Sequence, residues 1–224
     1  MSLNPFTAAY APVAVACIFV GSAGVAHAAG PADAAADESV TQVVTAVEAQ
    51  YAAVRSIQAN FTQIKTDSFG EMKQGGDVVV DRPNRMRWRF TSGDESVFAT
   101  DGKTLTLYNK ASDYYQQMPD NTADNATAQG FLTSLDTLDE VFAVSLVDGT
   151  SLAGAGPTLD LVPHTPGALS KIRLDLSSEL MLERLTLTDT YGNVTDIHFA
   201  DVVLNGPVDA SIFNFPHPTV EVDR

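Results

Sequence analysis

Residues 85–90 alternate strictly between arginines and large apolar side chains, reading Arg85-Met86-Arg87-Trp88-Arg89-Phe90. Because successive side chains of a β-strand point to opposite faces, this pattern predicts a strand with one basic and one apolar face. We interpret the basic face as solvent-exposed. Met, Trp and Phe are large side chains that suit either a packed core or a pocket for a flexible apolar ligand.

Just upstream, an arginine falls on the face that should be apolar. Residues 78–82 are also extended, and parity places Arg82 on the same side as Val78 and Val80. A buried guanidinium is costly unless its five donors meet acceptors. Unpaired carbonyls at the C-terminal end of a covering helix could supply those acceptors. Because Pro83 can end or bend the strand, a position at the rim is the alternative.

The chain from Ile57 onward has the two-residue period and frequent turn signals of an antiparallel sheet. The pair Asp101-Gly102 predicts a two-residue hairpin turn. Ser177-Ser178 and Gly192-Asn193 predict two later turns. The alternation is clearest in the run Lys171-Ile172-Arg173-Leu174-Asp175-Leu176.

Helical spacing precedes the sheet and also interrupts it. A capping-box signal at Ser39 begins an amphipathic helix that includes Val47 and Tyr51 and ends near Arg55. Residues 121–142 predict two short helices with one apolar face, formed by Phe131, Leu135, Leu138 and Phe142. We therefore expect a mainly β (α+β) domain in which helices cover one face of the sheet.

The first 28 residues have the composition of an export signal. They carry no charged side chain, and an apolar run ends in Ala26-His27-Ala28, an A-x-A cleavage pattern. We interpret residues 1–28 as a cleavable signal peptide, 29–37 as a flexible leader and 38–224 as one domain; a buried N-terminal helix is the alternative. The flanks of Cys17 do not fit a lipid-anchor site, so we expect export to the periplasm without an anchor.

Composition excludes several classes of protein. The 224 residues include 13 basic and 28 acidic side chains, a net charge of −15, which argues against nucleic acid and against anionic membrane surfaces as partners. Without Cys17 the exported chain would have no cysteine, hence no disulfide and no thiolate metal site.

Nothing in the sequence indicates an enzyme. It contains no G-x-S-x-G, P-loop, dinucleotide-binding glycine motif or H-E-x-x-H. His164, His198 and His217 lack metal-ligand spacing, so we expect no metal and no cofactor. We interpret the carboxylates of Asp136, Asp139 and Glu140 as a solvated helix face.

Five motifs, taken in order, resemble one known family. They are Ala59-Asn60-Phe61-Thr62-Gln63; Arg82-Pro83-Asn84 with Trp88; Asp101-Gly102-Lys103-Thr104-Leu105 with Tyr108-Asn109; Asp189, Gly192, Thr195 and Phe199; and Phe213-Asn214-Phe215. Over residues 40–220 the chain is thus similar to the LolA family of periplasmic carriers of outer-membrane lipoproteins. The resemblance implies an incomplete antiparallel β-barrel with a lid of α-helices over a hydrophobic cavity for acyl chains.

The resemblance also assigns roles to residues. Arg82 matches the family's arginine that hydrogen-bonds carbonyls of the lid helices in the closed form. The cavity residues expected are Met86, Trp88, Phe90, Leu105, Leu107, Leu174, Leu187 and Phe199. The lid residues expected are Val47, Tyr51, Phe131, Leu135 and Leu138.

Partners follow from the same resemblance. A monomeric chaperone of this kind would accept lipoproteins from an inner-membrane ABC exporter (LolCDE-like) and deliver them to an outer-membrane receptor (LolB-like). Two alternatives stay open: a lipid- or lipoprotein-sensing regulatory module on the same scaffold, and an enzyme of the same shape acting on an apolar molecule.

Overall fold

We describe a computed structural model of the chain, covering residues 31–120, 131–133, 135–147, 150 and 155–215, with side chains from Val40 onward. The predicted signal peptide, residues 1–28, lies outside the described residues, as does His217.

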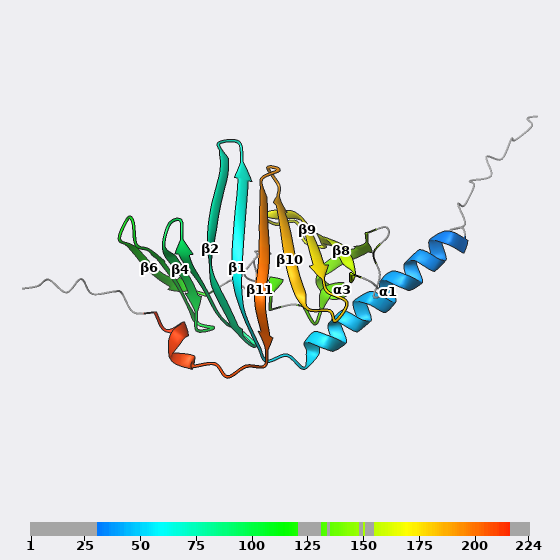
Figure 1. Ribbon diagram of the computed structural model, residues 1–224, viewed down its shortest axis with the longest axis horizontal. Coiled ribbons are helices and arrows are strands. Elements are labelled where there is room, and N and C mark those ends of the chain that lie inside the picture. Colours follow the sequence, from blue (N-terminus) through cyan, green and yellow to red (C-terminus); the bar gives the residue numbers. More distant parts are fainter. Residues whose placement is uncertain (1–30, 121–130, 134, 148–149, 151–154, 216–224) are drawn as a thin grey trace, which may run out of the picture.

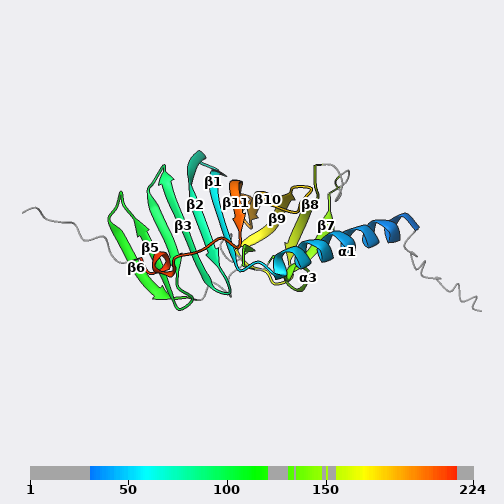
Figure 2. The same cartoon turned by 60° about the horizontal axis from the view of Figure 1, so that its bottom comes forward.

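The described residues form one antiparallel sheet of eleven strands in the order β6-β5-β4-β3-β2-β1-β11-β10-β9-β8-β7. The sheet curves strongly and does not close, so β6 and β7 are its free edges (Figures 1 and 2). This confirms the predicted mainly β fold, an incomplete antiparallel barrel. The strands are β1 (Ser56–Asp67), β2 (Gly70–Asp81), β3 (Arg85–Ser92), β4 (Ser96–Thr100), β5 (Thr104–Asn109), β6 (Tyr114–Pro119), β7 (Phe142–Leu146), β8 (Thr158–Pro163), β9 (Leu169–Leu176), β10 (Leu182–Asp189) and β11 (Val194–Leu204).

The topology explains where the helical residues lie. Strands β1–β6 and β7–β11 are two meanders that meet where β1 pairs with β11, at Phe61 opposite Phe199. Strands β6 and β7 are consecutive in the chain but lie at opposite edges, so their connection must span the sheet. Its described part, from Phe131 to Leu138, is packed into the apolar cluster of the concave face.

The concave face is apolar across the middle of the sheet because the registers align the alternating residues. Met86 lies opposite Val80, which lies opposite Ile57. On the other side of β1, Leu187 lies opposite Ile172, which lies opposite Leu161. The alternation predicted for residues 171–176 is therefore confirmed. At the β2–β3 pair, Gly76 packs so closely that an added Cβ would lie 1.8 Å from the carbonyl oxygen of Arg89.

The main helix is longer at one end and shorter at the other than the sequence predicts. Helix α1 (Pro31–Ala52) begins before the capping box at Ser39, so much of the expected leader is helical. It ends at Ala52 because the carbonyl of Tyr51 accepts from the backbone N–H of Val54, after which the chain enters β1.

The second helical region is described only in part. Among the described residues of 121–142, Phe131 is helical, 132–133 and 135–136 form turns, and α3 (Leu138–Val141) is a four-residue helix. Phe142, predicted on a helical face, instead begins β7, because its backbone pairs with Pro163 of β8. The predicted break at Gly130 lies outside the described residues.

Two of the three predicted turns lie where the sequence placed them, and the third is longer than predicted. Ser177-Ser178 and Gly192-Asn193 lie in the β9–β10 and β10–β11 turns, as predicted. The Asp101-Gly102 turn is longer than two residues, since Thr100 pairs directly with Leu105. The Asp101 carboxylate accepts from the backbone N–H groups of Lys103 and Thr104, which lowers its pKa and stabilises the longer loop.

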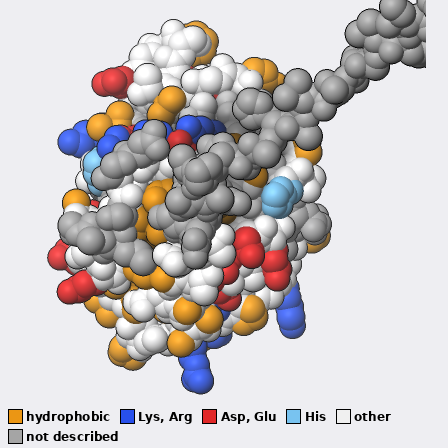
Figure 3. All heavy atoms as spheres, turned by 90° about the vertical axis from the view of Figure 1, so that its right-hand side faces the viewer, with side chains coloured by type: hydrophobic (Ala, Val, Ile, Leu, Met, Phe, Trp, Pro, Cys, Tyr) orange, Lys and Arg blue, Asp and Glu red, His pale blue; other side chains and the backbone are white. Residues whose placement is uncertain are grey.

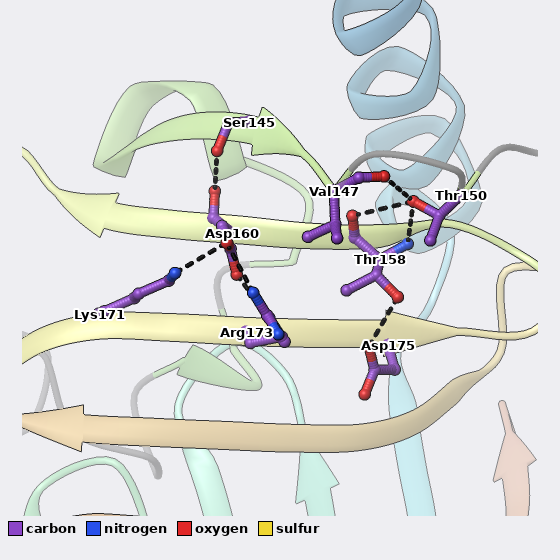
Figure 4. Close-up of polar contacts among 8 residues, drawn as sticks. All are labelled: Ser145, Val147, Thr150, Thr158, Asp160, Lys171, Arg173 and Asp175. Carbon is purple, nitrogen blue, oxygen red and sulfur yellow. Dashed lines mark hydrogen bonds and ion pairs between the residues drawn. The ribbon is translucent and has the colours of Figure 1, made fainter.

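The arginines of the convex face form ion pairs with acidic side chains, so they are not simply solvated. Asp77 accepts from Arg87 and Arg89 at 2.9 and 2.6 Å, and Asp81 pairs with Arg85. On β8 and β9, Asp160 lies between Lys171 and Arg173 at 2.8 and 2.7 Å, beside a hydrogen bond from Thr158 to Asp175 (Figure 4).

The C-terminal segment crosses the same convex face (Figure 2). After β11 it forms the short 3₁₀ helix η2 (Ala210–Phe213), and Phe213 is 2% exposed beneath the guanidinium of Arg85, 5.5 Å from the ring centre. Phe215 packs on Tyr108 and accepts a hydrogen bond from Tyr115. The segment therefore forms a second layer over β3, β5 and β6.

Candidate functional site

The predicted cavity residues all lie on the concave face. Phe90, Leu107 and Phe199 are half-buried there, on β3, β5 and β11. The others are buried, namely Met86, Trp88, Leu105, Leu174 and Leu187. The sheet thus presents one apolar surface, whose half-buried part lies on β3, β5 and β11.

An aromatic cluster marks the middle of this surface. Phe61 is 4.8 Å from Trp88 and 5.2 Å from Phe90 between ring centres, both edge-on, and Trp88 is 6.2 Å from Phe199. The indole N–H of Trp88 is satisfied by the sulfur of Met86 at 3.1 Å. Because its polar group is paired internally, the cluster offers only apolar surface to whatever covers it.

In this structure two segments cover the apolar surface. Val47 and Tyr51 of α1 are fully buried against it. So are Leu135 and Leu138 from the connection, and Phe131 packs edge-on against Phe142 at 5.8 Å. The five predicted lid residues therefore meet the same concave face. Viewed from the α1 side, hydrophobic side chains reach the surface between groups of acidic ones (Figure 3).

Arg82 points inward, to the junction of sheet and cover. It follows the last residue of β2, and its side chain is only 11% exposed. Its Nη1 donates to the backbone carbonyl of Tyr51 at 3.1 Å and lies 2.9 Å from the carboxylate of Asp136. Its Nε and Nη2 are buried and have no hydrogen-bond partner among the described residues. The guanidinium thus connects the sheet to both covering segments.

Tyr51 is held on its other side as well. Its hydroxyl donates to the carbonyl of Leu180 and accepts from the N–H of Leu182, both at 3.1 Å. Burial raises the pKa of the phenol to about 12. Leu180 has the left-handed backbone (φ 59) that directs this turn at the helix. Tyr51 therefore links the end of α1 to the β9–β10 turn and to Arg82.

A second polar contact joins the covering segments to each other. The carboxylate of Glu48 on α1 accepts from the backbone N–H of Asp139 at 3.1 Å, at the start of α3. Desolvation raises the pKa of Glu48, and the nearby Asp139 carboxylate adds to that rise. His164 contacts the Asp139 carbonyl at 3.2 Å.

One residue of this site was misinterpreted from the sequence. Asp136 is not simply part of a solvated face, because it pairs with Arg82. Its surroundings are rich in Thr, Ala and Asp, so no periodicity distinguished it from Asp139 and Glu140. The inward arginine indicated that the cover must supply acceptors, but it did not indicate which carboxylate would pair with it.

Other candidate sites lie elsewhere or are not seen. A pocket of about 410 Å³ opens at the end of β1, but polar residues such as Arg55, Asp81 and Asn205 line it. Within the described residues no group of three His, Cys, Asp or Glu side chains could hold a metal ion. None of the described helices is both long and apolar enough to cross a bilayer.

The fold and this site define a half-barrel protein whose apolar concave face is covered by segments fastened through one buried arginine. The sequence matches the family "Outer membrane lipoprotein carrier protein LolA" over residues 52–216. The chain belongs to the LolA family.

Similar proteins span most of the chain. An outer-membrane lipoprotein carrier protein of Chromohalobacter salexigens is 31% identical over 169 residues, 74% of this chain and 78% of that protein. One from Pectobacterium atrosepticum is 28% identical over 212 residues, 92% and 93% of the two chains. A crystal structure of a LolA superfamily protein from Nitrosomonas europaea aligns with TM-score 0.47 and 11% identity, over 78% of this chain and 97% of that one.

Proposed function

We propose that this protein is a periplasmic chaperone that carries lipoproteins from the inner to the outer membrane, sheltering their acyl chains against its concave face. The single observation that carries the proposal is Arg82, a buried charge on an apolar face that fastens the movable cover. Family membership supports the cargo, since the relatives are named outer-membrane lipoprotein carriers.

The physical need for such a carrier is large. Each acyl CH₂ left in water costs about 0.8 kcal/mol, so a lipoprotein with several long chains cannot cross an aqueous compartment unprotected. The carrier must also release its cargo. Closing the cover restores the Arg82 contacts and reburies residues such as Leu135, which offsets part of the energy gained by sheltering lipid.

We expect acyl chains to enter first at the half-buried residues of the concave face. Phe90, Leu107 and Phe199 are already partly accessible. The fully buried part, around Leu174 and Leu187, would become available only when α1 and the 131–138 segment move away.

Export and partners complete the proposal. The charge-free residues 1–28 and the A-x-A pattern support a cleavable signal peptide. A carrier of this kind takes cargo from an inner-membrane ABC exporter (LolCDE-like), passes it to an outer-membrane receptor (LolB-like), and needs no cofactor and no catalytic step.

The test is to purify the full chain from the bacterial envelope and identify bound molecules by mass spectrometry. Triacylated proteins support the carrier. Free phospholipid alone favours the lipid-sensing alternative, and turnover of an apolar small molecule favours an enzyme. Arg82→Leu should retain more acylated protein than wild type, because the cover no longer closes well. Arg89→Leu, an arginine change on the convex face, is the matched control. Equal loading in the two variants contradicts the role given to Arg82.

A further inference from the structure

We infer that Asp136 sets how readily the cover closes, through an ion pair that makes release of lipid sensitive to salt. This inference rests on the proposed carrier function and adds to it a second, ionic contact of Arg82. The observation is the 2.9 Å pair between Nη1 of Arg82 and the Asp136 carboxylate.

The charge of Arg82 has one nearby counterion. In the described part of the chain, Asp136 is the only carboxylate within ion-pair distance of Arg82. Tyr51 contributes a carbonyl dipole, and Nε and Nη2 meet no acceptor within the part of the chain that the structure describes. A buried guanidinium that is otherwise short of partners depends strongly on its single neutralising carboxylate.

The two charges lie on parts that must separate. Arg82 directly follows β2, and the β2 residues Val78 and Val80 are buried in the sheet, which fixes the position of Arg82. Asp136 is next to Leu135, a residue of the cover that is fully buried against the concave face. Any movement that lifts Leu135 off the concave face also carries the Asp136 carboxylate away from Arg82. The ion pair therefore exists only in the closed form.

The pair is also accessible to ions. The Asp136 side chain is 31% exposed, against 11% for Arg82. A partly exposed pair is screened by dissolved salt more than a fully buried one. Higher ionic strength should therefore favour the open form and strengthen lipid binding. A hydrogen bond to a carbonyl alone would not give this dependence.

The test measures binding of a fluorescent, triacylated cysteine peptide to the full-length exported chain. Asp136→Asn should bind the peptide about fivefold more tightly and release it correspondingly more slowly, as expected for a weakened charged hydrogen bond. Its affinity should change less with sodium chloride than that of wild type. Glu140→Gln removes the same charge from a neighbouring exposed position and is the matched control.

Two further variants separate the ionic role from a structural one. Asp136→Glu keeps the charge and should restore the salt dependence. In an Arg82→Leu background, Asp136→Asn should have no further effect, because its partner is gone.

Outcomes for the two proposals are distinct. If wild type fails to bind the acylated peptide, the carrier function itself is contradicted. If wild type binds but Asp136→Asn matches Glu140→Gln in affinity and salt dependence, only the inference about Asp136 is overturned. Additive effects of the Arg82 and Asp136 changes would overturn it as well.

Discussion

The guanidinium of Arg82 donates to the backbone carbonyl of Tyr51, 3.1 Å away, and so fastens the last turn of α1 to the end of β2. The final carbonyls of a helix lack intrahelical partners, and a cation close to them is stabilising. Helix α1 has no basic residue in its own last turn. Arg82, 31 positions later and directly after β2, supplies that charge, so the helix end is stabilised only while α1 lies on the sheet.

Replacing Tyr51 with Phe should destabilise the closed protein while leaving its carbonyl available to Arg82. The change removes two hydrogen bonds and leaves the buried N–H of Leu182 without its acceptor. We expect a loss of about 2 kcal/mol in the free energy of unfolding, measured by urea denaturation. Tyr191→Phe, at a side chain that is 91% exposed, is the control and should have little effect. A loss no larger than the control would mean that these bonds contribute nothing net.

The Tyr51 phenol also predicts a loss of stability at high pH. Burial raises its pKa from the usual 10.0 to about 12, so between these values the folded chain holds a proton that the unfolded chain has released. Stability due to this group is complete below about pH 10 and is lost as the pH rises toward 12. The decline should be shallower in Tyr51→Phe than in wild type. The measurement is the urea midpoint from pH 9 to 12, and parallel curves for the two proteins would contradict the prediction.

Arg82 shows how far the sequence could predict this site. Two-residue parity from Val78 placed it inward, and the need of a buried guanidinium for acceptors indicated a helix C-terminus, where Tyr51 provides one. Its ionic partner was not predictable in the same way. Asp136 lies 54 positions away in a segment whose place is set by tertiary packing.

Elsewhere in the fold, too, local periodicity was predictable from the sequence and long-range contacts were not. The periodicity of residues 171–176 was sufficient because each strand buries one face. The hydroxyl partners of Tyr51 lie 129 and 131 positions away, in a turn whose direction depends on the conformation of Leu180. Phe142 was misassigned because an apolar residue at helical spacing can equally begin a strand.

The ion pairs of Asp160 on the convex face should make the stability of the protein sensitive to acid. The hydrogen bond from Arg173, with the contribution of Lys171, lowers the pKa of Asp160 to about 2. The carboxylate therefore contributes stability above about pH 4, and the contribution is lost as the pH falls toward 2. We expect Asp160→Asn to cost about 1 kcal/mol at pH 7, since Arg173 and Lys171 are each more than 40% exposed and solvent screens the pair.

Lowering the pH provides the control for the Asp160 prediction, because it removes the charge of Asp160 from wild type. Unfolding of wild type and Asp160→Asn should be compared between pH 7 and 2, and the difference should vanish at the acid end. A difference that persists at pH 2 would indicate that Asp160 acts by packing and not by charge.

The C-terminal layer predicts a large effect from one aromatic ring. Phe213 is 2% exposed although it lies in a short 3₁₀ helix outside the sheet, and the guanidinium of Arg85 packs over its face. Phe213→Ala should cost about 3 kcal/mol, because it removes a buried ring, leaves a cavity and ends the cation–π contact. Phe69→Ala, where the ring is 97% exposed, is the matched control.

A separate measurement can show which part of the fold Phe213→Ala destabilises. Phe213 is on the convex face, opposite the proposed lipid surface, so Phe213→Ala should loosen the C-terminal segment over β3, β5 and β6 without weakening lipid binding by the folded protein. Hydrogen exchange should increase in β3–β5, and cleavage by proteases should increase near residues 205–215. If Phe213→Ala instead changes affinity for an acylated peptide while the fold is intact, then the C-terminal layer is coupled to the concave face through the sheet.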